Sequence, residues 1–258
     1  MALTNITVIG LGEAGRLYAE GLAANGATVR GYDPFLSVAS DSFTQHASLE
    51  SALDGTDIAL CLVGARAAAT VAADVAAAAP HPFVYADLNS TSPELKLAIG
   101  VTTADRGLLP CDVAVMAPVP RAGHRTPLLV SGPGADRCAD LLTPLGSPVE
   151  VIGADMGAAA QVKLLRSVFM KGLATLVIET LNAAELAGQR ERLTEQVAAE
   201  LGPNGAALVE RLVTGTYAHA GRREHEMLDA LAELQRIGAA HDMTDATIAT
   251  FRRILSEQ

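Results

Sequence analysis

Short apolar runs rich in β-branched residues alternate with longer segments of helical periodicity over the first part of the chain. The runs lie at 5–10, 27–32, 57–63, 83–88, 111–116, 127–131 and 148–152. Strands that alternate with helices in this way are typical of a parallel sheet covered by helices. The pattern therefore predicts a doubly wound α/β domain with a mostly parallel sheet.

The pattern changes after Gly153, where only helical periodicity remains. Breaks at "GQ" (188–189), "LGPNG" (201–205) and "HD" (241–242) divide this part into several helices. The chain is thus expected to contain an α/β domain of the dinucleotide-binding type over 1–153 and a smaller all-α domain over 154–258, joined by a long helix. The alanine-dense segment 65–79 is interpreted as a helix that covers the sheet.

Composition limits the classes of function. No apolar run approaches the length of about 18 residues that a membrane-spanning helix needs, and the first residues lack a basic signal-peptide start, so we expect a cytoplasmic protein. The formal net charge of −10 argues against broad nucleic-acid binding. The six histidines are scattered without ligand spacing, so no metal site is expected. Cys61, Cys111 and Cys138 are interpreted as reduced packing residues.

The stretch "VIGLGEAG" (8–15) joins the first strand to the first helix. Here Gly10 permits a tight turn, Gly12 lets backbone amides approach a pyrophosphate, and Gly15 allows the helix to pack closely on the strand. This is the fingerprint of a Rossmann-type dinucleotide site, for which the expected cofactor-binding residues are Gly10, Leu11, Gly12, Glu13, Ala14 and Gly15. The alternative is a tight strand-to-helix turn without a ligand.

Asp33 ends the second strand at the separation expected for a carboxylate that binds an adenosine ribose. Such a carboxylate repels a 2′-phosphate, so NAD is favoured and NADP is the alternative cofactor. Asp33 also precedes Pro34, and Asp-Pro is a common turn former. The alternative is therefore that Asp33 forms a turn and binds no ligand.

A candidate catalytic residue lies in the long helix, within "GAAAQVKLLRS" (157–167). Lys163 shares a helical face with Ser167 and Met170, and Arg166 is close enough to lower the pKa of the lysine amine towards neutrality. The alternative is a pair of solvated surface cations.

These motifs, together with "DLNSTSP" (87–93), resemble the β-hydroxyacid dehydrogenases, which include 3-hydroxyisobutyrate and 6-phosphogluconate dehydrogenases. The resemblance covers nearly the whole chain and implies that Lys163 is the proton donor and acceptor. It further implies a homodimer formed through the C-terminal helices. Residues expected by resemblance to lie near the cofactor are Gly64, Asn89, Ser90, Thr91 and His225.

The chain departs from the family pattern where the substrate is expected. Met116 stands at the position of a family serine, and Ser167 stands where the family tends to have asparagine. The segment 219–254 looks like a compact C-terminal domain of a less characterised branch. The departures leave the family's usual 3-hydroxy acid pose open.

A basic loop after Pro118 offers a replacement for the missing serine. Arg guanidinium groups bind carboxylates and related oxyanions with two hydrogen bonds, so a carboxylate, phosphonate or sulfonate substrate is expected. An exposed loop with solvated charges is the equally weighted alternative. The candidate substrate residues are Met116, Pro118, Arg121, His124, Arg125, Arg166, Ser167 and Met170.

The sequence thus predicts an oxidoreductase that transfers a hydride between a nicotinamide cofactor and a small anionic hydroxy compound, with Lys163 as general acid and base. Two alternatives remain open. An imine reductase shares this architecture but commonly lacks the lysine, and a non-catalytic NAD-binding module would keep only the glycine turn. The apolar stripe Leu228, Leu231, Leu234 and Ile237 either supports the dimer or forms the core of its own domain.

Overall fold

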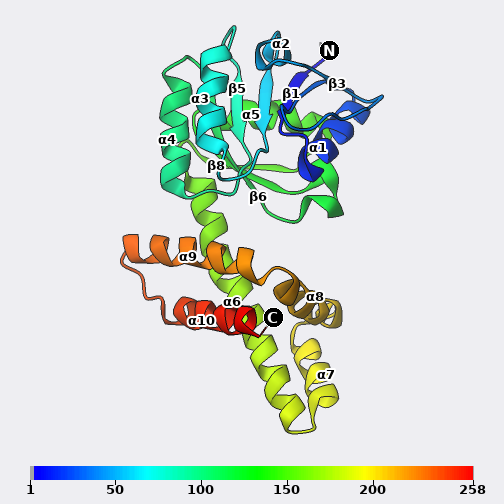
Figure 1. Cartoon of the computed structure of the whole chain (residues 1–258), viewed down its shortest axis with the longest axis vertical. Coiled ribbons are helices and arrows are strands. Elements are labelled where there is room, and N and C mark those ends of the chain that lie inside the picture. Colours follow the sequence, from blue (N-terminus) through cyan, green and yellow to red (C-terminus); the bar gives the residue numbers. More distant parts are fainter. Residues whose placement is uncertain (1–2, 258) are drawn as a thin grey trace. The chain divides into compact units, whose positions relative to one another are not determined.

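The computed structural model describes residues 3–257 and divides into two compact units, which meet between Lys163 and Leu164 (Figure 1). This boundary lies later than the one expected near Gly153. The reason is that α6 (Ala158–Leu186) begins as part of the first unit. The amide of Ala159 donates to Ser131 Oγ at 3.0 Å and that of Ala160 donates to Asp112 Oδ2 at 2.8 Å, which ties the first turn of α6 to the sheet.

The first unit is built on one eight-stranded sheet with the order β3-β2-β1-β4-β5-β6-β7-β8. All seven predicted strands are confirmed, and the two-residue edge strand β3 is an addition that the pattern did not predict. Strands β1 to β6 run parallel, whereas β7 is antiparallel to β6 and β8 is parallel to β7. The bounds are β1 Asn5–Ile9, β2 Thr28–Tyr32, β3 Thr44–Gln45, β4 Ile58–Cys61, β5 Val84–Asp87, β6 Leu109–Val115, β7 Leu128–Ser131 and β8 Val149–Gly153.

Helices cover both faces of this sheet. One face packs against α1 (Glu13–Ala24) and α5 (Ala135–Leu142), and the other packs against α2 (Leu49–Leu53), α3 (Ala68–Ala78) and α4 (Pro93–Ala104). In β4 and β5 alternate residues enter opposite clusters. In β4, for example, Ile58 and Leu60 belong to the cluster with α1, and Ala59 and Cys61 belong to the cluster with α3. The alanine-dense segment is therefore a covering helix, as predicted.

The second unit contains the rest of α6 and four further helices, α7 (Arg190–Glu200), α8 (Gly205–Ala218), α9 (Ala220–Arg236) and α10 (Asp242–Ser256). The three predicted breaks separate α6, α7, the α8–α9 pair and α10, and a fourth break at His219, between α8 and α9, was not predicted. Two apolar clusters hold the unit together, one around Phe251 and Met227 and one around Val177 and Leu212. Within residues 3–257, no helix has the combination of length and apolar character that crossing a bilayer requires.

The topology of the first unit prepares one place for a ligand. β1 lies between β2 and β4 in the sheet. From β1 to β3 the chain proceeds towards one edge of the sheet, and from β4 to β8 it proceeds towards the other edge. At such a switch point the helices leave the sheet on different faces, and a crevice opens beyond the carboxyl ends of the strands.

Candidate functional site

The glycine turn lies at this crevice, between β1 and α1. Gly10 has φ +90°, a backbone conformation that favours glycine, and a Cβ there would lie 2.6 Å from the Leu62 carbonyl oxygen. A Cβ on Gly15 would overlap the Gly10 carbonyl oxygen, so α1 packs directly on the turn. No Cβ contact lies within 4 Å at Gly12, and no side chain among the described residues caps α1. The start of α1 thus presents its amide groups and partial positive charge to open space.

The turn residues predicted to bind a cofactor divide into two groups. Gly12 and Glu13 are exposed and Ala14 is half-buried, so this short segment can contact a ligand. Leu11 and Gly15 are buried, and the Leu11 amide already donates to Asp33 Oδ2 at 2.8 Å. Leu11 and Gly15 thus shape the turn from within the protein, and their contact with a cofactor stays a prediction.

Asp33 organises the loop after β2 as well as the glycine turn. Its Oδ1 accepts hydrogen bonds from the amides of Phe35 at 2.9 Å and Leu36 at 3.1 Å, in addition to the bond from Leu11 to Oδ2. A carboxylate has about four lone-pair sites, so one acceptor position remains beyond these three bonds. Asp33 is half-buried and lines the crevice, which leaves this position within reach of a hydroxyl group.

A cavity of about 760 Å³ opens beside the turn, within the range of about 300–1,000 Å³ typical of small-molecule sites. Its walls come from the ends of β1, β2 and β4 and from α2 and α3. Their charged side chains are all acidic, namely Asp33, Glu50 and Asp74. A ligand group with a further negative charge is therefore disfavoured there.

Lys163 and Ser90 meet on the same unit. The lysine Nζ donates to Ser90 Oγ at 2.8 Å, although the two residues are 73 positions apart. Ser90 lies in the loop between β5 and α4, and Lys163 lies in the second turn of α6. The fold therefore brings together two residues that the sequence proposed separately.

Asn89 is buried, and its side-chain amide connects the loop after β4 to the loop after β5. Its Oδ1 accepts from the Gly64 amide at 2.7 Å, and its Nδ2 donates to Asp87 Oδ1 at 2.5 Å and contacts Cys61 Sγ at 3.5 Å. Gly64, which has φ +87°, is thus held by the loop after β5. Thr91 Oγ1 is buried without a hydrogen-bond partner among the described residues.

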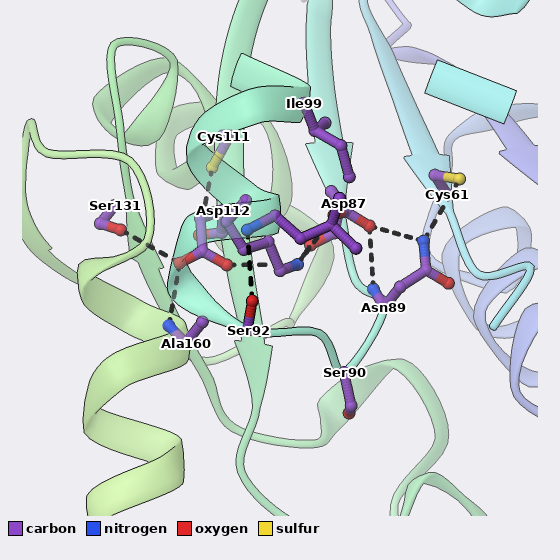
Figure 2. Close-up of polar contacts among 12 residues, drawn as sticks. Cys61, Asp87, Asn89, Ser90, Ser92, Ile99, Cys111, Asp112, Ser131 and Ala160 are labelled. Carbon is purple, nitrogen blue, oxygen red and sulfur yellow. Dashed lines mark hydrogen bonds and ion pairs between the residues drawn. The ribbon is translucent and has the colours of Figure 1, made fainter. Parts of the chain in front are cut away.

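Sequence reasoning missed the charged cluster beneath this loop (Figure 2). Lys96 on α4 is 1% exposed, and its Nζ lies 3.0 Å from Asp87 Oδ2 and 3.2 Å from Asp112 Oδ1. The two aspartates end β5 and lie within β6, where both are fully buried. The available signal was a single aspartate in each of two apolar strands and a lysine at the start of a mostly apolar helix, since such charges are rarely buried without a partner.

Burial also makes the thiol of Cys61, at the end of β4, less acidic. The pKa of Cys61 is raised to about 11, chiefly because burial disfavours the thiolate. Cys61, Cys111 and Cys138 are all buried and free, which fits the prediction of packing residues.

The basic loop between β6 and β7 is arranged differently from the expectation. His124 is buried, a Cβ on Gly21 would overlap its ring, and its Nε2 lies 3.2 Å from Asn25 Nδ2. Gly21 and Asn25 belong to the C-terminal end of α1, and at a rise of about 1.5 Å per residue Gly21 lies roughly 13 Å along the helix from Gly12. His124 therefore supports α1, and its prediction as a substrate residue is corrected.

The remaining residues of this loop keep their status as predictions. Pro118, Arg121 and Arg125 are exposed, and Met116 is half-buried directly after β6. Burial, reinforced by the nearby Arg125 cation, lowers the pKa of His124 below its ordinary value.

The other candidate substrate and cofactor residues belong to the second unit. Ser167 Oγ accepts from Lys171 Nζ at 2.9 Å, and Lys171 Nζ also pairs with Glu226 at 2.7 Å. Met170 packs against the cluster around Val177. Arg166 and His225 are exposed, and His225 Nδ1 contacts the Gly221 carbonyl at 2.8 Å. Their roles towards a substrate or cofactor stay predictions.

Among residues 3–257, no three or more His, Cys, Asp or Glu side chains are grouped so as to hold a metal ion. The candidate site therefore consists of the glycine turn, the acidic cavity and the Lys163–Ser90 pair.

Comparison with known proteins adds relatives to this geometry. A domain of unknown function, DUF1932, matches residues 184–254. An uncharacterised 28.5 kDa protein in the 7S RNA 5′ region of Methanothermus fervidus is 27% identical over 160 residues, which are 62% of this chain and 60% of that protein. The match therefore spans less than two thirds of this curated relative.

Two solved structures cover almost the whole chain. A conserved hypothetical protein from Sinorhizobium meliloti 1021 is 31% identical, with a TM-score of 0.79 over 97% of this chain and 88% of its own. The conserved protein MTH1747, which is structurally similar to 3-hydroxyacid dehydrogenases, is 25% identical, with a TM-score of 0.79 over 97% and 96%. The chain belongs to the β-hydroxyacid dehydrogenase-like family.

More distant members show the same fold. A 3-hydroxyisobutyrate dehydrogenase from Mycobacterium tuberculosis, solved with L-serine, has a TM-score of 0.83 at 18% identity over 99% of this chain and 94% of its own. A reductive aminase from Aspergillus terreus, solved with NADPH, has a TM-score of 0.64 at 17% identity over 99% and 95%. The β-hydroxyacid dehydrogenase-like fold thus occurs in proteins named for two different reactions, dehydrogenation of a hydroxy acid and reductive amination.

Proposed function

We propose that this protein is an NAD(P)-dependent oxidoreductase that acts on a small anionic hydroxy compound, with Lys163 as general acid and base. The observation that carries the proposal is the Lys163–Ser90 contact at 2.8 Å in the unit that also holds the glycine turn. A bare dinucleotide-binding module has no need for a lysine held in this way.

The residues present fit a dinucleotide. The uncapped start of α1 and the open position at Gly12 suit a pyrophosphate, and the free acceptor position of Asp33 suits a ribose hydroxyl. The cavity favours NAD over NADP, because a 2′-phosphate would lie beside the Asp33 carboxylate in a cavity that also carries Glu50 and Asp74. When bound, the nicotinamide supplies the hydride chemistry.

Lys163 supplies proton transfer. The neutral amine accepts the proton of a substrate hydroxyl during oxidation, and the ammonium returns it during reduction. Ser90 Oγ accepts a hydrogen bond from Nζ and so fixes where the amine points. The exposed guanidinium groups of Arg121 and Arg125 remain candidates for holding the anionic group of the substrate.

The proposal is tested by nicotinamide absorbance with a panel of short hydroxy acids, hydroxyphosphonates and hydroxysulfonates. We expect turnover with NAD in the wild type. Replacing Lys163 by Ala should lower kcat by about 10²–10⁴-fold, the usual contribution of a general acid and base, with little change in NADH affinity. Lys171→Ala is the matched control on the same helix, and equal losses in the two variants would contradict the role of Lys163.

A second candidate is imine reduction. The departures Met116 and Ser167 and the shared fold with a reductive aminase favour it. A panel of cyclic imines and ketone–amine pairs with NADPH and NADH separates the two reactions. Turnover of imines that survives Lys163→Ala would replace the first proposal, whereas tight NADH binding without any turnover would indicate a cofactor sensor.

We also propose a homodimer formed through the C-terminal helices, in a cytoplasmic protein. Apolar side chains that remain exposed on the second unit support the association, among them Phe169 at 67% and Leu176 at 56% on α6. In the predicted stripe, Leu234 is buried and Leu231 packs on a cluster, while Leu228 and Ile237 stay exposed. A monomer in light scattering at working concentration would contradict the dimer.

A further inference from the structure

Lys96 is an unusual residue for this chain. Of the 19 lysine and arginine residues only three are lysines, namely Lys96, Lys163 and Lys171. Lys96 is 1% exposed, and besides its two carboxylate partners its Nζ donates to the Asp87 carbonyl oxygen at 2.6 Å. A compact ammonium can approach three oxygens inside a core, which a planar guanidinium of fixed geometry does less well.

One branch of contacts leads from Lys96 to Ser90. The ammonium contacts Asp87 Oδ2 at 3.0 Å, while Asp87 Oδ1 accepts from the Asn89 amide at 3.0 Å and from Asn89 Nδ2. Ser90 is the next residue in the chain. Lys96 thus fixes the loop that carries the hydroxyl group in contact with Lys163.

The other branch leads from Lys96 to Lys163. Asp112 Oδ1 lies 3.2 Å from the ammonium, and Asp112 Oδ2 accepts from the Ala160 amide at 2.8 Å (Figure 2). Ala160 is in the first turn of α6, one helical turn before Lys163. A carboxylate at this place also interacts favourably with the partial positive charge of the helix start.

The two branches close into a ring. Both partners of the Lys163–Ser90 hydrogen bond are anchored to the same ammonium, one through Asp87 and Asn89 and the other through Asp112 and α6. We propose that Lys96 is a positioning residue that sets the geometry of the Lys163–Ser90 pair. The inference deepens the proposed function, on which its catalytic consequence rests.

The alternative is that Lys96 only braces the fold. The two cases differ in whether a change at Lys96 is felt at the Lys163 amine. Protein labelled with [ε-¹³C]lysine should give only three lysine signals, which Lys163→Arg and Lys171→Arg assign, and each signal can be titrated without any substrate.

The test variant is Lys96→Met combined with Asp112→Asn. One positive and one negative charge are removed together, so the net charge of the cluster is unchanged, and the asparagine oxygen can still accept from the Ala160 amide. Circular dichroism reports whether the variant is folded. If it does not fold, Asp112→Asn alone is used, because it keeps Lys96 and weakens only one branch.

We expect the Lys163 signal to broaden and its titration midpoint to fall by about half a pH unit, while the Lys171 signal is unchanged. The fall follows because the Lys163 ammonium donates to Ser90, so loss of this bond disfavours the protonated form. Ser90→Ala should give the same fall, and the two changes together should give no more than either one alone. An unchanged midpoint in a folded variant, or fully additive falls, would overturn the positioning role.

Kinetics then separate this inference from the proposed function. With a substrate that the wild type turns over, kcat should fall about tenfold or more in the variant while the KM for the cofactor stays within about twofold. A coupled Lys163 signal in a wild type without turnover would refute the proposed function and leave the positioning role standing. Normal kcat and an unmoved signal in the variant would refute the positioning role alone.

Discussion

At the ends of β1, β2 and β4 the edge of the sheet opens into a cavity lined by apolar and acidic side chains, whereas at the ends of β5 and β6 it is closed around a buried ammonium between two carboxylates. The open half needs only a backbone that leaves room, which glycine provides. The closed half must hold two loops and the start of α6 in register. Charge is buried and paired where position matters, and it lines an open cavity where a ligand needs space.

The strongest test of this comparison is the stability of the closed half. Lys96→Met leaves Asp87 and Asp112 buried without their ammonium partner, so the free energy of unfolding should fall by about 3–5 kcal/mol. Lys171→Met is the control, since its ion pair with Glu226 is partly exposed and should contribute about 1 kcal/mol or less. Urea unfolding measures both variants. Equal losses would show that burial of the charge is not what distinguishes Lys96.

The open half is tested with two glycines of the same turn. Gly15→Ala forces a Cβ onto the Gly10 carbonyl and should cost about 1–3 kcal/mol of stability. Gly12→Ala points into open space, so its stability should stay within about 0.5 kcal/mol of the wild type. NADH affinity should nevertheless fall about tenfold or more in Gly12→Ala, because the added methyl group occupies the approach of the pyrophosphate. Thermal unfolding and NADH fluorescence give the two readouts, and wild-type NADH affinity in Gly12→Ala would remove the glycine turn from the cofactor site.

The smallest expected effect concerns His124, which is buried against α1. Burial lowers the pKa of His124 below its ordinary value of 6.5, so as the pH falls the unfolded chain binds this proton before the folded chain does. The stabilisation is complete above pH 6.5 and is lost as the pH falls through the lowered pKa of the folded state. Urea midpoints from pH 7.5 to pH 5 should therefore decline less in His124→Gln than in the wild type. Parallel declines would place the titrating group elsewhere.

Local pattern was sufficient for most of the fold. The seven strands, the covering helix over 65–79 and the glycine turn all follow from interactions between residues close in sequence, because periodicity and the conformational freedom of glycine act within a few residues. The domain boundary was placed too early because the first turn of α6 is bonded to Ser131 and Asp112, which are far away in the chain.

The site was predictable only in part for the same reason. His124 looked like a free cation in a basic loop, but the packing of that loop against Gly21 and Asn25 buries it. The role of Lys96 could not be predicted from the sequence, because nothing within a few residues of it shows that its ammonium lies between aspartates of two strands.

The sequence by itself determined the α/β architecture followed by helices, the glycine turn at the first strand and the choice of Lys163 as the candidate catalytic amine. Only the tertiary structure decided that Lys163 meets Ser90, that Asp33 already binds three backbone amides, and that a buried lysine links both ends of the Lys163–Ser90 contact. The physical reason is that secondary structure and turns depend on short-range sterics, whereas the partners of a buried charge are chosen by where separate strands and helices meet.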